Sequence, residues 1–233
     1  VMKLFGLLSV FILVFFTDVV KAQYDEDWDS RTFELDNFNE IKLEGGYRVF
    51  LIQGHENSLL VKASDDDVFD YLKIDNDTES LRLKIDREHF NFDRISLYIT
   101  FKELERIDIE GGVKLKTKGY LDLNDFAMHV EGGAKIELDM KAEDVEIVSE
   151  GGVLFELDGV AETLDVKVSG AGHIDASELK TKEVTFRIEG VGTGNVYATE
   201  KLYAQIEGVG KVKYRGHPQV TKNIDGLGTV TSD

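Results

Sequence analysis

Seven acidic residues stand at corresponding places in a repeated motif, and each directly precedes a glycine, as in LEGG, IEGV and IDGL. They are Glu44, Glu110, Glu131, Glu150, Glu189, Glu207 and Asp225. Ser169 takes the same place in an eighth copy of the motif. Carboxylates that recur in this way can act together, either as oxygen ligands of a hard cation or as one line of a charged surface.

The acidic positions recur at a nearly constant interval. Counting Ser169, the steps after Glu110 are 21, 19, 19, 20, 18 and 18 residues, and only the step from Glu44 to Glu110 is longer. A repeat of about 19 residues predicts that equivalent residues lie over one another, and we call this line of residues the acidic corner column. Carboxylates stacked about 4.8 Å apart would repel by roughly 0.9 kcal/mol in water.

Two sources of positive charge could offset this repulsion. Basic residues stand four positions after four of the acids, at Arg48, Lys114, Lys135 and Lys211, and His173 follows Ser169 at the same distance. The first interpretation is therefore a solvated surface of alternating charge across each corner. The second is a column that bridges Ca²⁺ or another hard cation. We expect no other cofactor, because the sequence lacks metal-binding histidine motifs, a phosphate loop and a catalytic serine or cysteine motif.

The elements that must position these acids follow from the glycines. The first glycine of each motif is present in all eight copies, at Gly45, Gly111, Gly132, Gly151, Gly170, Gly190, Gly208 and Gly226. Apolar residues alternate with polar ones on both sides of each motif, as at Phe186 and Ile188 before Gly190. Period-two alternation predicts strands with one buried face, so each unit is a strand, a glycine corner, a second strand and a turn.

The regular spacing favours a parallel β-helix, or β-solenoid, with coils of about 18–21 residues over an antiparallel meander. Equivalent corners would then lie directly over one another. Glycine suits such a corner because a tight bend needs positive φ, and side chains stacked there would collide. We therefore predict an all-β fold in which the eight glycines are structural.

The chain divides into three predicted parts. Residues 1–22 read as a signal peptide, with Lys3 before an apolar run and small residues before the expected cleavage site. Residues 23–105 hold one corner and less regular strand patterns, and we expect irregular β coils that cap the stack, with one helical turn in DDDVFDYLKI. Residues 106–233 carry the regular coils, continuous with the preceding part.

The charge of the chain restricts its partners. The net charge is −18, and it becomes −19 once Lys3, Lys21 and Asp18 leave with residues 1–22. Such a chain repels nucleic acid. The absence of cysteine fits an exported bacterial envelope protein, in the periplasm, at the outer membrane or outside the cell. No second long apolar segment follows, so we expect no membrane span after signal cleavage.

The segment from Val166 to Val220, with VSGAGH, IEGVGT, VYATEKL and YRGHPQV, resembles the GIN-domain family of autotransporter-adhesin head domains from exported Bacteroidetes proteins. The resemblance extends over about Phe33 to Val230. It implies a right-handed, single-chain β-helix. The family's corners are often serine-rich, whereas most corners here carry glutamate, so a serine-lined surface does not carry over.

We expect a non-enzymatic envelope domain that serves adhesion, glycan or protein binding, or scaffolding. Its partner would be an envelope protein or a glycan, and open ends or edges of the solenoid could also pair two copies as a homodimer. The alternative is an enzyme of the polysaccharide lyase type on a β-helix. Coils of 18 to 21 residues leave little length for the long loops that wall a lyase cleft, which disfavours the enzyme.

Overall fold

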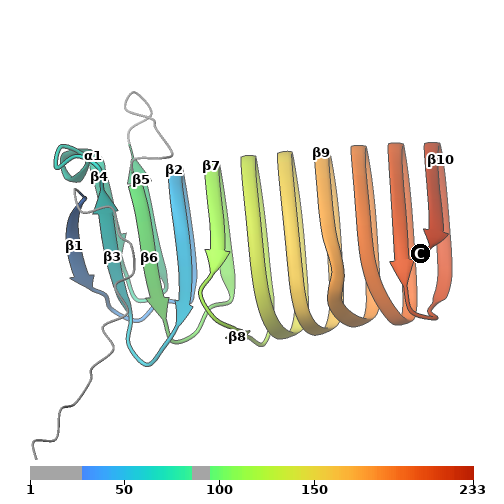
Figure 1. The fold of residues 1–233 in the computed structure, drawn as a ribbon, viewed down its shortest axis with the longest axis horizontal. Coiled ribbons are helices and arrows are strands. Elements are labelled where there is room, and N and C mark those ends of the chain that lie inside the picture. The colour runs from blue at the N-terminus through green and yellow to red at the C-terminus, as the bar shows by residue number, and fades with distance from the viewer. Residues whose placement is uncertain (1–27, 86–94) are drawn as a thin grey trace, which may run out of the picture.

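The computed structural model describes residues 28–85 and 95–233, and within these ranges the protein is all-β apart from one short helix. The predicted signal peptide, residues 1–22, lies outside the described residues. The elements in chain order are β1 (Asp29–Glu34), β2 (Glu40–Gln53), β3 (Ser58–Ala63), α1 (Val68–Tyr71), β4 (Leu72–Asn76), β5 (Ser80–Ile85), β6 (Ile95–Phe101), β7 (Arg106–Thr117), β8 (Leu121–Asp122), β9 (Phe126–Arg215) and β10 (Gln219–Ser232). Figure 1 shows them side by side in one row from β1 to β10.

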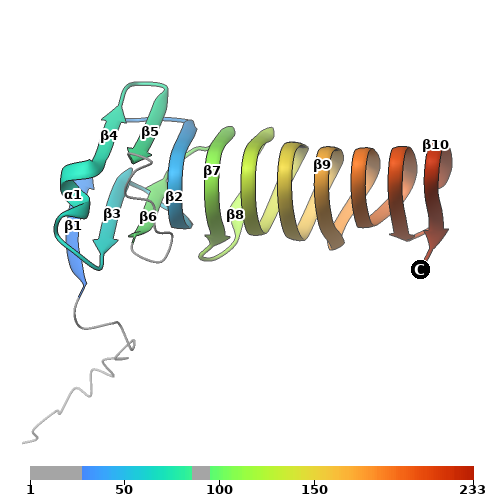
Figure 2. The same ribbon diagram turned by 90° about the horizontal axis from the view of Figure 1, so that it is seen from above.

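The strands form one open, mixed sheet with the order β1-β3-β6-β2-β7-β9-β10, and β4, β5 and β8 pair off this path. β9 is a single run of 90 residues that passes through five glycine corners. Figures 1 and 2 show it as successive coils of ribbon along the row. The strand pairing continues through the bends, because corner glycines of neighbouring turns pair in register.

Neighbouring turns pair in parallel, with corner upon corner. Glu44 pairs with Glu110 between β2 and β7, Glu110 pairs with Glu131 between β7 and β9, and the glycines that follow pair in the same register. At the other end of the row, Asp225 of β10 pairs with Glu207 of β9. The prediction of parallel strands with equivalent corners in register is therefore confirmed for these pairs.

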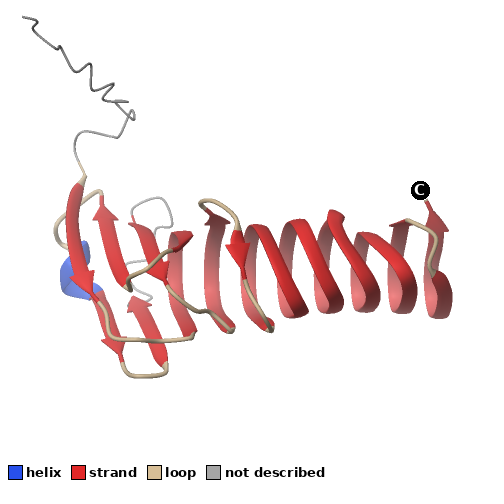
Figure 3. Cartoon of the chain, turned by 90° about the horizontal axis from the view of Figure 1, so that it is seen from below, coloured by secondary structure: helices blue, strands red, loops and turns tan. Residues whose placement is uncertain are grey.

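The N-terminal part adds antiparallel strands that the repeat did not predict. β5 pairs in parallel with the segment of β2 before its corner, and β6 pairs in parallel with the segment after it. Beyond them, β4 is antiparallel to β5, and β3 and β1 follow β6 in antiparallel order. Val68–Tyr71 forms the predicted helical turn, α1. Figure 3 shows most loops in this part and near β8 and β10, whereas β9 continues without one.

One hydrophobic core runs through the whole row. The inward-facing residues alternate with outward-facing ones, so that Val184, Phe186 and Ile188 are all buried in one strand segment. The largest fully buried side chains come from both parts of the chain and include Tyr47, Phe101, Phe126, Phe155 and Phe186. Burial of each such side chain contributes about 1.5–3 kcal/mol, so every turn stabilises its neighbours.

Candidate binding surfaces along the corner column

The corner glycines form a close-packed column. All eight have positive φ, between 118° and 138°. A Cβ atom built on Gly132 would overlap the carbonyl oxygen of Gly111, one turn earlier, and a Cβ on each later corner glycine meets the same obstacle. Any other residue would therefore be strained in its backbone and would collide with the neighbouring turn.

The position of the second glycine decides where the corner side chain points. The first four corners read Gly-Gly, and the next residue is buried; these residues are Tyr47, Val113, Ala134 and Val153. The last four corners read Gly-x-Gly, and the middle residue is exposed; these residues are Ala171, Val191, Val209 and Leu227. We call the second set the apolar ridge. The switch moves an aliphatic side chain from the core to the surface without interrupting the strand.

The acidic corner column is continuous along the outside of this bend. Its first three members pair in register, as do Glu207 and Asp225, and the contacts between corner glycines connect the turns in between. Ser169 donates a hydrogen bond to Glu189 with an oxygen–oxygen distance of 3.3 Å. The structure therefore brings all seven predicted acids onto one edge, although neighbouring surfaces differ along it.

The expected pairing of Glu131 with Lys135, four positions on, is wrong. Lys135 Nζ lies 2.7 Å from Glu137 Oε1 and 3.7 Å from Glu156 Oε1 instead. Three acids of the column, Glu44, Glu131 and Glu189, instead lie near basic side chains on the strand segments before the corner. Residues two apart on a strand, or side by side on neighbouring strands, share a face, whereas the corner turns the following residues away from it.

Glu189 and Glu44 illustrate this pairing on the side before the corner. Lys167 Nζ lies 2.9 Å from Glu189 Oε1, and the lysine holds the pKa of that carboxyl below its usual range. Glu44 pairs with Lys84 on the neighbouring strand. Within residues 28–85 and 95–233, no group of three or more His, Cys, Asp or Glu side chains is placed to hold a metal ion. The calcium interpretation thus receives no support from the described side chains.

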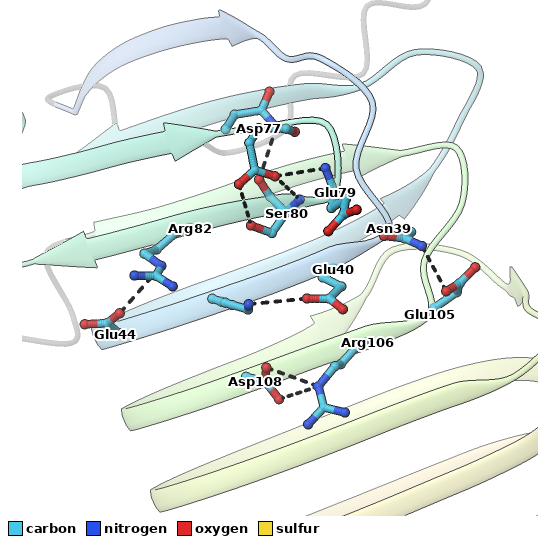
Figure 4. Close-up of polar contacts among 12 residues, drawn as sticks. Asn39, Glu40, Glu44, Asp77, Glu79, Ser80, Arg82, Glu105, Arg106 and Asp108 are labelled. Carbon is cyan, nitrogen blue, oxygen red and sulfur yellow. Dashed lines mark hydrogen bonds and ion pairs between the residues drawn. The ribbon is translucent and has the colours of Figure 1, made fainter.

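A polar pocket of about 320 Å³ lies on the outer face of the segments before the corners, where β5, β2, β7 and β9 run side by side. Its charged lining consists of Lys42, Glu44, Arg82, Arg106, Asp108, Glu110, His129 and Glu131. Figure 4 shows Arg82, Glu44, Arg106 and Asp108 on this face of neighbouring strands. The polar pocket offers cationic donors and carboxylate acceptors in similar numbers.

Ion pairs orient the cations of the polar pocket without covering them. Arg106 Nε donates to both carboxylate oxygens of Asp108, at 2.9 and 3.2 Å, and Arg82 Nε lies 3.9 Å from Glu44 Oε1. The side chains of Arg82 and Arg106 remain 50% and 44% exposed. His129 Nε2 is buried and lies 3.6 Å from Glu131 Oε1, beyond hydrogen-bond distance. A ligand in the pocket could therefore reach both guanidinium groups.

The turn between β4 and β5 fixes the strand that carries Arg82. The backbone N–H groups of Glu79 and Ser80 donate to Asp77 Oδ1 at 2.9 and 2.7 Å, and these hydrogen bonds hold the pKa of Asp77 below its usual range. Figure 4 shows this turn beside the pocket. The polar side chains are thus held by paired strands and not by long loops.

A second hollow follows the last corners. This apolar groove has a volume of about 620 Å³, and Gly152, Gly172, Gly192 and Gly210 lie along its floor. Three members of the apolar ridge, Ala171, Val191 and Val209, line one side of it, and Leu154, His173, Thr193 and Lys211 line the other. The acidic corner column continues beside the ridge as Glu189, Glu207 and Asp225. The same column therefore borders a polar pocket at its start and an apolar groove at its end.

The sequence interpretation missed Arg82, Arg106, Asp108 and His129. Asp108 and His129 stand two residues before Glu110 and Glu131, and Arg106 stands four before Glu110, all in the outward phase of the alternation. That phase was available in the sequence as a signal. Arg82 could not be found in this way, because β5 has no glycine corner and reaches the pocket only through its pairing with β2.

Residues 37–218 match the family model described as "Putative auto-transporter adhesin, head GIN domain". The chain belongs to this GIN-domain family. The match covers most of the chain and agrees with the resemblance seen in the repeated corners. A comparison with curated protein sequences gives no significant match.

Solved structures show the same fold. A putative adhesin from Bacteroides fragilis superposes with a TM-score of 0.80 at 23% identity, covering 89% of this chain and 98% of the other. A putative adhesin from Parabacteroides merdae gives 0.66 at 20% identity, with 90% and 97% covered. A protein described as a putative lipid binding protein, from Parabacteroides distasonis, gives 0.66 at 18% identity, with 90% and 98% covered. The described residues of this GIN-domain chain contain no helix long and apolar enough to cross a membrane.

Proposed function

We propose that this GIN-domain chain is an exported, non-enzymatic domain of the cell envelope that holds a glycan or protein ligand on its outer face, for adhesion or scaffolding. In this proposal the stacked parallel turns form a right-handed, single-chain β-solenoid. The domain acts in the periplasm, at the outer membrane or outside the cell. Membership of an adhesin-type family and the predicted signal peptide support this placement.

The polar pocket is the observation that carries the proposal. Sugar hydroxyl groups both donate and accept hydrogen bonds, and the pocket places arginine and lysine donors among four carboxylate acceptors. Its charges nearly balance, although the whole chain carries a net charge of −18. A neutral glycan, or a polar segment of a protein, therefore suits the pocket better than a polyanion such as nucleic acid.

The strands that line the polar pocket also favour binding over turnover. Side chains on paired strands are held more firmly than side chains on loops, so a ligand meets a surface that is already organised. The pocket is a shallow depression on a sheet face, which suits repeated contact with an extended chain. Such a surface fits adhesion or scaffolding.

Binding of immobilised glycans and capture of native envelope proteins test this proposal. We expect the wild-type chain to bind at least one of them, and the double variant Arg82→Gln/Arg106→Gln to bind at least tenfold more weakly. Lys201→Gln, which removes a surface ion pair with Glu183 in a distant turn, serves as the matched control and should bind like wild type. Equal binding by the pocket variant and the wild type would overturn the proposal.

The same preparation tests the lyase alternative. A polysaccharide lyase would cleave uronate polymers and release unsaturated products. These products absorb in the ultraviolet. We expect no such product from wild-type chain incubated with these polymers. Product formation that Arg82→Gln/Arg106→Gln abolishes would replace the binding proposal with an enzymatic one.

A further inference from the structure

The apolar ridge is exposed although the fold does not require it. Val191, Val209 and Leu227 are 59%, 50% and 75% exposed, whereas the corner side chains of the first four turns lie in the core. The sequence places them outside by moving the second glycine one position along. Large aliphatic side chains in a continuous row on the surface of a strongly charged protein indicate a contact surface.

The floor of the groove beside the ridge is glycine backbone, because side chains at the last corners would point into the core and collide there. A Cβ atom built on Gly210 would meet Ile188 and Ile206, which occupy the core below it, and Gly228 is closed off by Ile206 in the same way. The floor is therefore glycine backbone at each of the last corners. Ridge and groove lie side by side, and both repeat with every turn. Neighbouring turns are about 4.8 Å apart.

We infer that the ridge and groove bind a second copy of this chain, with the two stacks side by side and pointing in the same direction. A two-fold axis parallel to the stacking direction places each copy's ridge over the other copy's groove. A two-fold axis across the stack would instead set ridge against ridge and leave both grooves empty. Because both copies repeat with the same spacing, Val191 and Val209 meet glycine floor in every turn.

The charges select the same arrangement. The acids of the column flank the ridge on one side, and His173 and Lys211 stand on the far wall of the groove. The parallel two-fold axis brings Glu207 of one copy towards Lys211 of the other. The crossed arrangement would set acid against acid. Within residues 28–85 and 95–233, Glu207, Asp225 and Lys211 make no ion pair, although Glu207 accepts a hydrogen bond from Gln205 and Lys211 contributes to the lowered pKa of Asp233. Ion pairs between copies are therefore open to all three charges.

The end of the stack is a less suitable surface for a second copy. Lys222 of β10 pairs in register with Ala204, a buried residue, so the lysine stands at a core-facing position. A charge at such a position opposes the burial of a strand edge against another strand. We therefore place the second copy along the corners and not at this end of the stack.

Sedimentation equilibrium of the full chain tests association, at about 150 mM salt so that repulsion beyond about 8 Å is screened. We expect a reversible dimer, and we expect Val191→Asp/Val209→Asp to raise its dissociation constant at least tenfold. Val160→Asp changes an exposed valine outside the groove and should leave the dimer intact. Circular dichroism verifies that each variant folds. A wild-type monomer at all concentrations, including one that takes up an apolar ligand in the groove, would overturn the inference.

Single cysteines test the direction, because the chain has none of its own. Equivalent residues lie at the same height in a parallel pair, so Val191→Cys, Val209→Cys and Leu227→Cys should each form a disulfide with its own copy under mild oxidation. Val160→Cys should not. If at most one of the three ridge variants forms a cross-link, the copies run in opposite directions and the inference fails. Lys211→Glu should weaken the dimer, and adding Glu207→Lys should restore it.

Discussion

At the scale of single residues, the corner glycines combine two constraints that can be separated by mutation. Gly132 has a φ of 118° and no room for a Cβ atom against Gly111. Gly119 also has a positive φ, of 92°, but no atom lies within 4 Å of the place where its Cβ would stand. Substituting both glycines therefore separates the energetic cost of the collision between turns from the cost of the strained backbone conformation.

We expect Gly132→Ala to lower the free energy of unfolding by about 3 kcal/mol, because backbone strain and a collision add. Gly119→Ala should lose only about 1 kcal/mol from strain alone. Urea unfolding of both variants measures the difference. Equal losses would show that the turns do not rest on one another at their corners.

Ser149 is a second residue whose role can be measured. It is 1% exposed at the corner of the fourth turn, and its Oγ atom has no hydrogen-bond partner. A buried hydroxyl without a partner costs about 1–3 kcal/mol. Ser149→Ala should therefore raise the free energy of unfolding by about 1 kcal/mol, visible as a higher melting temperature. A lower melting temperature would mean that the hydroxyl is satisfied in solution.

Tyr47 should make the fold sensitive to alkaline pH. Burial, together with the charge of Glu44, raises the pKa of its hydroxyl well above the ordinary range, and the hydroxyl donates to the Glu44 carbonyl oxygen at 2.8 Å. Below about pH 10 the tyrosine is protonated in both the folded and unfolded states. Above that pH only the unfolded state ionises at this residue, so stability falls.

Unfolding of wild type and Tyr47→Phe at pH 8 and pH 11 measures this effect. We expect Tyr47→Phe to be less stable at pH 8, because it loses the hydrogen bond, and to lose less stability than wild type between the two values. An identical loss in both proteins would assign the alkaline effect to other groups.

At the scale of the strands, outward-facing charged side chains attract their neighbours at some positions and repel them at others. Asp158 lies among Asp139, Glu178 and other acids, and its partial burial, with these charges, raises the pKa of its carboxyl. Asp165 instead accepts two hydrogen bonds from Arg187 Nη1, at 2.7 and 3.0 Å. Removing the charge of Asp158 should therefore stabilise the protein, whereas removing the charge of Asp165 should destabilise it.

Asp158→Asn should stabilise the protein at pH 7 and Asp165→Asn should destabilise it, each by about 0.5 kcal/mol because both sites are exposed. The gain from Asp158→Asn should shrink as the pH falls and the wild-type carboxyl itself becomes protonated. Melting temperatures at pH 7 and pH 4 measure both effects. Effects of the same sign would contradict the proposed charge pattern.

The strands also show how far the sequence alone could lead. The alternation around Phe186 and Ile188, with glycine every 18 to 21 residues, was enough to predict parallel turns with corners in register. The antiparallel pairing of β1, β3 and β4 was not predictable, because the alternation in a short segment does not indicate which strand of the sheet it pairs with. The pairing of Lys135 with Glu137 was missed because it depends on how far the corner turns the chain.

At the scale of the whole molecule, two different surfaces share one column of acids. The first three Gly-Gly corners lie beside the polar pocket, the fourth stands at the end of the apolar groove, and the Gly-x-Gly corners carry the apolar ridge. The acidic corner column was predicted as one surface, and its residues do lie on one edge. Its division into two surfaces follows from the position of the second glycine and from Arg82 on β5, which the repeat does not contain.

The most direct test of this account is a binding titration of one captured glycan or envelope protein against three proteins: wild type, Arg82→Gln/Arg106→Gln and Val191→Asp/Val209→Asp. We predict that the pocket variant binds at least tenfold more weakly. The ridge variant should keep the affinity of a single site, measured with soluble ligand. Full binding by the pocket variant, or loss of binding by the ridge variant alone, would contradict the account.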